Sequence, residues 1–425
     1  MPYQNNFHHS HYSRADPGSR VSYRTFHPGA ALDSPAWRQG MAEVGAQLAK
    51  AQVKGILFLN GHPFTDLFGA ARLDEVGGLK RGYSRGISGL ESLLAHLRPD
   101  TNGIYLADDP IHPPMVNNEP TQHTLDVLAQ EVGNFTTAYV RKFSQALGQE
   151  IENTISCSRY VWSSTNHHVG RVEASLDVIK FLQEWGTGLS LSNGDRLLFI
   201  GYGHAGQVLA LLSNLIPRGE SEARARIFEI LANYWQSSPS GRRSIDGLEE
   251  LYKKLLADEV LCGAKMDVVT LGTPVRYGWD TEGVGHLLHM VNHRPLRPDG
   301  KRWLAKMELP QTAWEIPYQT GGDYVQQLAV AGTDHVPAPE AEQANLEFRE
   351  MLEPYDGFER WLECTRRTTR CANDGQCLLV EYGVQPEETP REHLYGHGCY
   401  TQSGAMLFTA SEIAQSFYSQ PESAT

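Results

Sequence analysis

The stretch "DRLLFIGYGHAGQVLALLSNLI", residues 195–216, decides the fold of this protein. An apolar run leads into a turn that contains three glycines and then into a second apolar run, the pattern of a buried strand followed by a buried helix. Gly201, Gly203 and Gly206 spell G-x-G-x-x-G, the phosphate-binding fingerprint of dinucleotide-binding folds. The same turn also fits a nucleophile elbow, G-x-Ser-x-G, with glycine at the serine position.

Strand and helix patterns alternate on both sides of this stretch. Residues 53–61, "VKGILFLNG", form an apolar run typical of a strand buried on both faces of a parallel sheet. Residues 154–164 predict another strand, and residues 167–185 predict an amphipathic helix that His167 and His168 begin. Later strands are predicted over residues 266–275, 323–337 and 375–384. This alternation predicts an α/β fold with a mostly parallel central sheet and helices on both faces.

The chain is predicted to form one folded domain with an arm and an insertion. Residues 1–33 are rich in His, Tyr, Ser and Pro without periodicity and predict an irregular N-terminal arm. Ser34 followed by Pro35 predicts the start of a helix, and residues 34–425 predict the α/β domain. The segment over about residues 64–150 is longer than a simple crossover and predicts an inserted lid or cap.

Composition narrows the expected partners. The 425 residues carry a net charge of -13, which disfavours nucleic acid and anionic membranes as partners. We expect no membrane span and a cytoplasmic location, because no window approaches 18 consecutive apolar residues and the N-terminal segment lacks the apolar core of a secretory signal. A small-molecule ester, a lipid or another apolar ligand fits this composition better.

Two clusters contain residue types that can bind metals. They are His8, His9 and His11, and Cys364, Cys371 and Cys377. The histidines have no carboxylate or cysteine partner at a ligand spacing, and the cysteines contain no C-x-x-C pair. We therefore predict no metal site and no cofactor, and the role of the cysteine cluster stays open.

A dinucleotide site needs more than its glycines. The helix must lead promptly into a second strand that ends in an acidic residue about twenty residues further on. Glu220 and Glu222 lie at that distance, but they lie in a loop that opens a helix. A dinucleotide-binding oxidoreductase is therefore the weaker alternative.

An elbow requires a loop that offers a backbone N–H before it, then a carboxylate and a histidine after it, in that order. The segments "LFLNGHPF" (57–64), "LAVAGTDHVP" (328–337) and "HLYGHGCYT" (393–401) supply all three. With these motifs the chain resembles the α/β-hydrolase family, in particular its lipase-like and esterase-like bacterial members. "GYGHAG" resembles the family's "GHSHGG" elbow, and "VVTLGTP" (268–274) resembles the strand after it.

The resemblance covers about residues 53–418 and implies an α/β-hydrolase fold with a site at the carboxyl edge of the sheet. It implies Gly203 at the nucleophile position, Asp334 as the acid and His397 as the base, with the backbone N–H groups of His62 and His204 lining an oxyanion hole. Two residues are weaker alternatives, namely Asp323, which would lie at the wrong end of its strand, and His393, whose neighbours are less flexible.

Glycine has no hydroxyl to attack an acyl carbon, so serine-dependent ester hydrolysis is lost or impaired. Three explanations stay open. The protein is a non-catalytic binding or scaffolding protein, a carboxylic-ester hydrolase that activates water directly with His397 and Asp334, or a serine enzyme inactivated by substitution. The aromatic and histidine-rich segments 276–280 and 286–295 predict either pocket lining or core packing.

Overall fold

A single parallel sheet organises the described part of this protein. The computed structural model describes residues 21–61, 117–148, 155–162, 165, 167–217, 219–237, 245–274, 276–280, 282–293, 322–323, 325–326, 337–352, 374–383 and 394–419. Its strands are β1 (Val21–Thr25), β2 (Val53–Asn60), β3 (Ser156–Val161), β4 (Arg196–Tyr202), β5 (Lys265–Leu271), β6 (His286–Asn292) and β7 (Gln376–Glu381). Their order is β1-β7-β6-β5-β4-β2-β3, and every neighbouring pair is parallel. The predicted α/β fold with a parallel sheet is confirmed.

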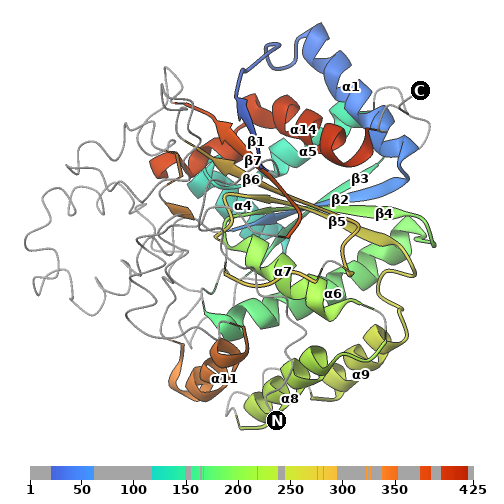
Figure 1. Ribbon diagram of the computed structural model, residues 1–425, viewed down its shortest axis with the longest axis vertical. Helices are drawn as coiled ribbons and strands as arrows, with labels where there is room; N and C mark the ends of the chain where they lie inside the picture. The colour runs from blue at the N-terminus through green and yellow to red at the C-terminus, as the bar shows by residue number, and fades with distance from the viewer. Residues whose placement is uncertain are drawn as a thin grey trace, which may run out of the picture.

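Helices cover both faces of the sheet (Figure 1). One layer contains α1 (Pro35–Lys50), α5 (Thr137–Leu147) and α14 (Met406–Tyr418). The other contains α6 (His168–Leu189), α7 (Ala205–Leu215), α8 (Glu222–Ser237), α9 (Ile245–Leu256) and α11 (Glu342–Leu352), while α4 (Glu119–Ala129) precedes α5. No helix among the described residues is long and apolar enough to cross a membrane.

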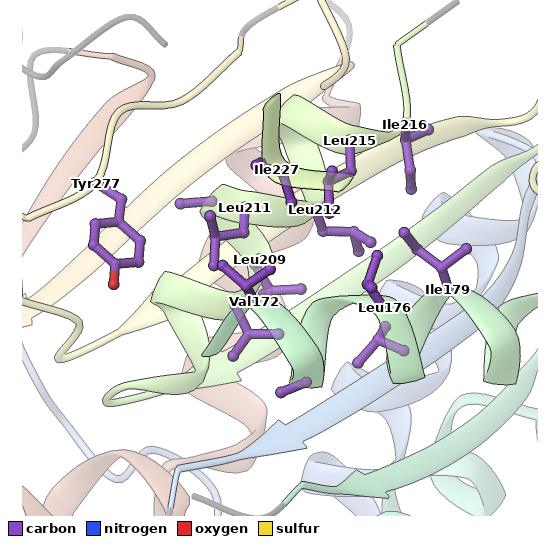
Figure 2. Close-up of a cluster of buried hydrophobic side chains, with 14 of the residues drawn as sticks. Val172, Leu176, Ile179, Leu209, Leu211, Leu212, Leu215, Ile216, Ile227 and Tyr277 are labelled. Carbon is purple, nitrogen blue, oxygen red and sulfur yellow. The ribbon is translucent and has the colours of Figure 1, made fainter. Parts of the chain in front are cut away.

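The opening stretch of sequence forms β4 and α7 at the centre of this arrangement. All of α7 is buried, which explains why its sequence is apolar on every side rather than amphipathic. Figure 2 shows its residues Leu209 and Leu212 packed toward Val172 and Leu176 of α6, in the larger of the buried hydrophobic clusters. Burial of this helix pair holds the turn between β4 and α7 against the sheet.

Part of the predicted N-terminal arm belongs to the sheet, which corrects the prediction for residues 1–33. Residues 21–25 form β1, which pairs in parallel with β7, and Tyr23 donates a hydrogen bond of 2.6 Å to Glu381. Local sequence did not reveal this strand, because its partner lies more than 350 residues later in the chain. The predicted helix from Pro35 is confirmed, with Ser34 as its N-cap.

The predicted insertion over about residues 64–150 is partly built into the main domain. Phe135, Tyr139 and Phe143 pack with Phe58 of β2, and their ring centroids lie 5.0 to 5.9 Å from that of Phe58. The segment that contains α5 is therefore a core layer. A lid role for the remainder stays a prediction, and residues 62–116 lie outside the described part.

Strand β6 was not predicted as a strand; its segment, with His286, His289 and the following His293, was expected either to line a pocket or to pack in the core. His289 is buried in the structure. Its Nδ1 lies 2.7 Å from Oγ1 of Thr270, and its Nε2 lies 3.2 Å from the carbonyl oxygen of Asp374. The carbonyl can only accept, so Nε2 donates and Nδ1 accepts from the threonine hydroxyl. His289 is therefore a core residue whose two ring nitrogens are both satisfied.

Burial lowers the pKa of His289 from 6.5 to about 4, although its hydrogen bond to the Asp374 carbonyl acts in the opposite direction. Below pH 6.5 the unfolded chain therefore binds a proton that the folded chain rejects, so folding stability falls as the pH falls toward 4. We expect this residue to remove about 2 kcal/mol of unfolding free energy between pH 7 and pH 5.

Urea unfolding across this pH range measures the effect. The His289→Gln variant, which cannot titrate, should show a flatter pH dependence, whereas replacement of the exposed His27 by glutamine should leave it unchanged. Equal slopes for the wild type and His289→Gln would contradict the assignment.

Near the amino ends of the central strands, the buried carboxylate of Asp267 in β5 contacts three other elements. Asp267 of β5 accepts from Nη1 of Arg196 at 2.8 Å and from the hydroxyl of Tyr418 in α14 at 2.8 Å. Nδ1 of His286 lies 3.0 Å from the same carboxylate, which is fully buried. Asp267 thus connects β4, β6 and the last helix.

Replacing Asp267 by alanine should lower the free energy of unfolding by about 3 kcal/mol, because it leaves the Arg196 cation and two further polar groups without their shared acceptor. Urea denaturation gives the measurement. The matched control is Glu249→Ala on the exposed side of α9, which should change stability by about 0.5 kcal/mol or less. Similar losses in the two variants would show that the Asp267 contacts contribute little.

Candidate functional site

The turn between β4 and α7, residues 201–206, is a rigid backbone corner. Gly203 has φ of +54°, a left-handed conformation that glycine adopts without strain. Its N–H donates to the carbonyl of Leu271 at 2.9 Å, and its carbonyl accepts from Oγ1 of Thr273 at 2.8 Å. Gly206 has no room for a side chain, because a Cβ there would overlap the side chain of Thr273. The glycines of the turn are thus explained by backbone conformation and close packing.

The end of β2 lies against this turn. A Cβ on Gly61 would overlap the carbonyl oxygen of Tyr202 and would lie 3.1 Å from the backbone nitrogen of His204. His204 is the N-cap of α7, and the amino end of a helix favours negative charge. The structure therefore brings Gly61, the residue directly after β2, to the backbone of His204. His62, the other predicted oxyanion donor, lies outside the described residues.

A buried polar network fixes the end of β2. The Asn60 side chain donates to Oδ1 of Asn134 at 2.7 Å and accepts from the backbone N–H of Phe135 at 2.9 Å. The Asn60 carbonyl accepts from the indole of Trp162 at 2.6 Å, and Arg159 donates to the same Asn134 oxygen at 2.7 Å. Both polar ends of the Asn60 side chain are used, so the side chain is held in place at the end of β2.

The predicted base His397 faces this turn from the loop after β7, between the short helices η6 (Leu394–Gly396) and η7 (Gly398–Thr401). Its Nε2 lies 3.0 Å from the position that a Cβ would take on Gly203. Apart from the chain neighbours of Gly203, no other described residue has an atom within 4 Å of that position. Gly203 and His397 thus lie together although the sequence separates them by almost 200 residues.

The carboxylate partner of His397 is Asp323. Its Oδ2 lies 2.6 Å from Nδ1 of His397, and both side chains are almost fully buried. An ionised carboxylate can only accept, so Nδ1 carries a proton, and in the neutral imidazole Nε2 is the acceptor that faces Gly203. We refer to Asp323 and His397 as the dyad.

Two further donors hold the Asp323 carboxylate. The Tyr400 hydroxyl donates to Oδ2 at 2.9 Å and accepts from the N–H of Asn292 at 2.6 Å, while the N–H of Gln326 donates to Oδ1 at 2.8 Å. Burial and the Asp323 charge raise the pKa of Tyr400 well above 10, so the phenol keeps its hydrogen and remains a donor. These bonds orient the carboxylate toward the imidazole.

Other close contacts fix the imidazole. The Tyr202 hydroxyl donates to the carbonyl of His397 at 3.0 Å, and the two ring centroids lie 4.5 Å apart. Gly272, at the end of β5, allows the dyad to approach the sheet, because a Cβ there would lie 2.6 Å from Oδ2 of Asp323 and 2.9 Å from Cε1 of His397. The base is therefore held by contacts from β4, β5 and its own loop.

The sequence selected Asp334 as the acid, but the structure pairs His397 with Asp323, and Asp334 lies outside the described residues together with His393. The reason given against Asp323 was wrong. Residues 325–326 are helical rather than part of a strand, and the N–H of Asp323 donates to the carbonyl of Asn292 at the end of β6. The acidic residue thus lies beside the end of a strand that the sequence did not reveal.

Two histidines at the start of α6 and a tyrosine after β5, namely His167, His168 and Tyr277, are buried. His167 caps α6 by accepting from the N–H of Gly170 at 3.0 Å, and His168 lies 2.7 Å from the Tyr277 hydroxyl. Arg171 donates to that hydroxyl at 2.8 Å. The prediction that the paired histidines begin a helix is confirmed. Within the described ranges there is no group of three or more His, Cys, Asp or Glu residues that could hold a metal ion.

The dyad, the glycine turn and the amino end of α7 therefore meet at the carboxyl edge of the parallel sheet, where ligand sites of open α/β sheets lie. The arrangement contains an oriented base and a nearby helix N-terminus, which together can remove a proton and stabilise a developing negative charge. Comparison of the chain with models of known protein families, with curated proteins and with solved structures found no match.

Proposed function

We propose that this chain is an α/β-hydrolase-fold protein of esterase or lipase type in which serine-dependent hydrolysis of acyl esters is lost, because Gly203 occupies the nucleophile position. One observation carries the proposal, namely that Nε2 of His397, oriented by Asp323, faces the Cβ position of Gly203 at 3.0 Å. An acid–base pair in this relation to a strand-to-helix turn is the arrangement by which serine hydrolases activate their nucleophile.

The proposed roles follow the geometry. Asp323 holds the imidazole in the tautomer with the proton on Nδ1, and His397 is the base. The backbone N–H of His204 contributes to the oxyanion hole, with that of His62 as a predicted second donor. The net charge of -13 favours a neutral ester or another apolar ligand over an anionic one.

The second candidate is a non-catalytic ligand-binding or scaffolding protein on the same fold. Gly203 itself favours this candidate, because a chain without an attacking group loses the covalent route to hydrolysis. A dinucleotide site has less support. The helix after the glycine turn leads into α8 and α9 before the next strand, and Glu222 lies in the first turn of α8 rather than at the end of a strand.

The test is to restore the missing hydroxyl. Wild type, Gly203→Ser and Gly203→Ala are assayed with short- and medium-chain acyl esters and treated with a fluorophosphonate probe. The proposal requires a burst of ester hydrolysis and labelling by the probe in the serine variant only. A folded serine variant that neither hydrolyses esters nor reacts with the probe would contradict it.

A further inference from the structure

The dyad is complete as a proton acceptor, although the residue it faces has no proton to give. The buried Asp323 carboxylate accepts from His397, Tyr400 and the N–H of Gln326, so its charge is balanced by three donors. The imidazole is left with one unprotonated nitrogen, Nε2, on the side of Gly203. A bound molecule can supply the proton that residue 203 lacks.

The backbone around Gly203 is fixed, so it cannot move to fill the position beside Nε2. Its N–H and its carbonyl are both hydrogen-bonded, to Leu271 and to Thr273. The position of a Cβ on Gly203 is within 3.0 Å of Nε2 and has no other described neighbour within 4 Å apart from the adjoining residues. A small molecule that contacts Cα of Gly203 can place its hydroxyl oxygen beside Nε2 of His397. This oxygen would lie slightly further from Cα than the hydroxyl oxygen of a serine at position 203.

We infer that the dyad is the general base for direct acyl transfer from an ester to a small hydroxyl acceptor, either water or a short primary alcohol, with no acyl-enzyme. This inference rests on the proposed function, because it uses the same site and the same class of ester. It differs in assigning a reaction to the chain as it stands, with glycine at position 203.

The chemical step balances without any further reactant. Nε2 of His397 takes the proton of the acceptor hydroxyl while its oxygen forms a bond to the acyl carbon. The carbonyl oxygen becomes an oxyanion beside the N–H of His204 at the start of α7. When the tetrahedral intermediate collapses, the bond to the ester's alkoxy oxygen breaks, and Nε2 returns the proton to the leaving alcohol. Water yields a carboxylic acid, whereas an alcohol yields a new ester.

The proposed reaction requires glycine at position 203, because a side chain there would take the space of the acceptor. A methyl group there would lie 3.0 Å from Nε2, which is closer than most contacts of a Cβ, and it would occupy the place of the acceptor. Gly203→Ala is therefore expected to block the reaction, although alanine carries no charge and no hydrogen-bonding group. This dependence on an absent side chain distinguishes direct transfer from a serine mechanism.

The experiment uses the full chain with p-nitrophenyl butyrate, with and without added methanol. p-Nitrophenolate release and methyl butyrate formation are measured together. We expect steady release without a burst, methyl butyrate in proportion to methanol, and no reaction with a fluorophosphonate probe. If only the acid forms at every methanol concentration, water is the acceptor.

Two variants test the role of the site. His397→Gln should lower both product rates at least tenfold. This threshold is smaller than the factor of about 10² to 10⁴ that general-base catalysis contributes. Gly203→Ala should lower them to a similar extent, so that the test survives if one variant fails to fold. His27→Gln, which removes an exposed histidine that is not part of the dyad, is the control for unspecific imidazole catalysis and should leave both rates unchanged.

The outcomes separate the inference from the proposed function. Rates in His397→Gln or Gly203→Ala equal to those of the wild type would overturn the inference, as would a burst or an acyl group on His397 detected by mass spectrometry. If the inference fails in this way while Gly203→Ser hydrolyses esters and binds the probe, the proposed function stands alone. Failure of the serine variant as well would overturn both the proposed function and the assignment of this site to acyl chemistry.

Discussion

Replacing Gly203 by serine is expected to raise acyl-ester hydrolysis at least about 10²-fold above the rate of the Gly203→Ala variant. The serine oxygen would lie one bond beyond the Cβ position, which is 3.0 Å from Nε2 of His397. The imidazole can then take the hydroxyl proton as the oxygen attacks. The expected gain is below that of an evolved triad, because no other residue of the site has adapted to a serine.

The substitution has a structural cost that the alanine variant shares. Gly203 has φ of +54°, and a non-glycine residue in that conformation costs about 1–3 kcal/mol. A Cβ at 3.0 Å also requires the His397 ring to move by a few tenths of an ångström. Serine and alanine impose the same backbone strain and the same Cβ contact, so their difference reports the hydroxyl alone.

Initial rates with p-nitrophenyl butyrate and labelling by a fluorophosphonate provide two independent readouts, and a melting curve reports whether each variant is folded. We expect a burst and stoichiometric labelling only in Gly203→Ser. Equal rates in the serine and alanine variants, with both folded, would mean that His397 does not activate residue 203.

In the serine variant, Asp323→Asn should lower kcat at least about 10²-fold, to the level of the Gly203→Ala variant, because a wrong imidazole tautomer removes the gain that the serine brings. The asparagine amide can donate to Nδ1 of His397, which would move the ring proton to Nε2 and remove the acceptor that faces residue 203. The substitution keeps the size of the side chain, but an amide nitrogen at the position of Oδ2 cannot accept from the Tyr400 hydroxyl, so a melting curve must show that the variant is folded.

Asp334→Asn in the same background is the matched control. Asp334 is the acid that the sequence favours, and Asp323 is the residue bonded to the imidazole at 2.6 Å. We expect the Asp334 variant to retain kcat within about threefold, a change of less than about 1 kcal/mol in the activation barrier. The opposite ranking, a large loss with Asp334→Asn and a small one with Asp323→Asn, would return the acid role to Asp334.

Much of the fold was predictable because it depends on local patterns. The apolar runs of β2, β4 and β5 are buried on both faces of a parallel sheet, and such strands are recognisable from their own residues. The turn at Gly203 was predictable for the same reason, because a strand, a glycine turn and an apolar helix follow one another directly. His397 stood out through Gly396 and Gly398, which allow its loop to bend.

Strands β1 and β6 were not predictable in this way. The five residues of β1 complete an edge of the sheet only by pairing with β7, more than 350 residues away. Histidines interrupt the apolar run of β6, so its sequence lacks the pattern of a buried strand. In the structure both ring nitrogens of His289 are hydrogen-bonded, to Thr270 and to a backbone carbonyl. The hydrogen-bond partners that allow a polar side chain to be buried come from other parts of the fold, so the sequence of the strand does not reveal them.

The sequence by itself determined the parallel α/β class, the turn at Gly203 and the position of His397 after the last strand, because each depends on residues that are neighbours in the chain. Only the tertiary structure decided which carboxylate meets the imidazole. Asp323 and His397 are 74 residues apart, and their 2.6 Å contact depends on the end of β6 and on the Tyr400 hydroxyl. A hydrogen bond between side chains requires both groups to be placed within a few tenths of an ångström, and that placement comes from packing of the whole domain.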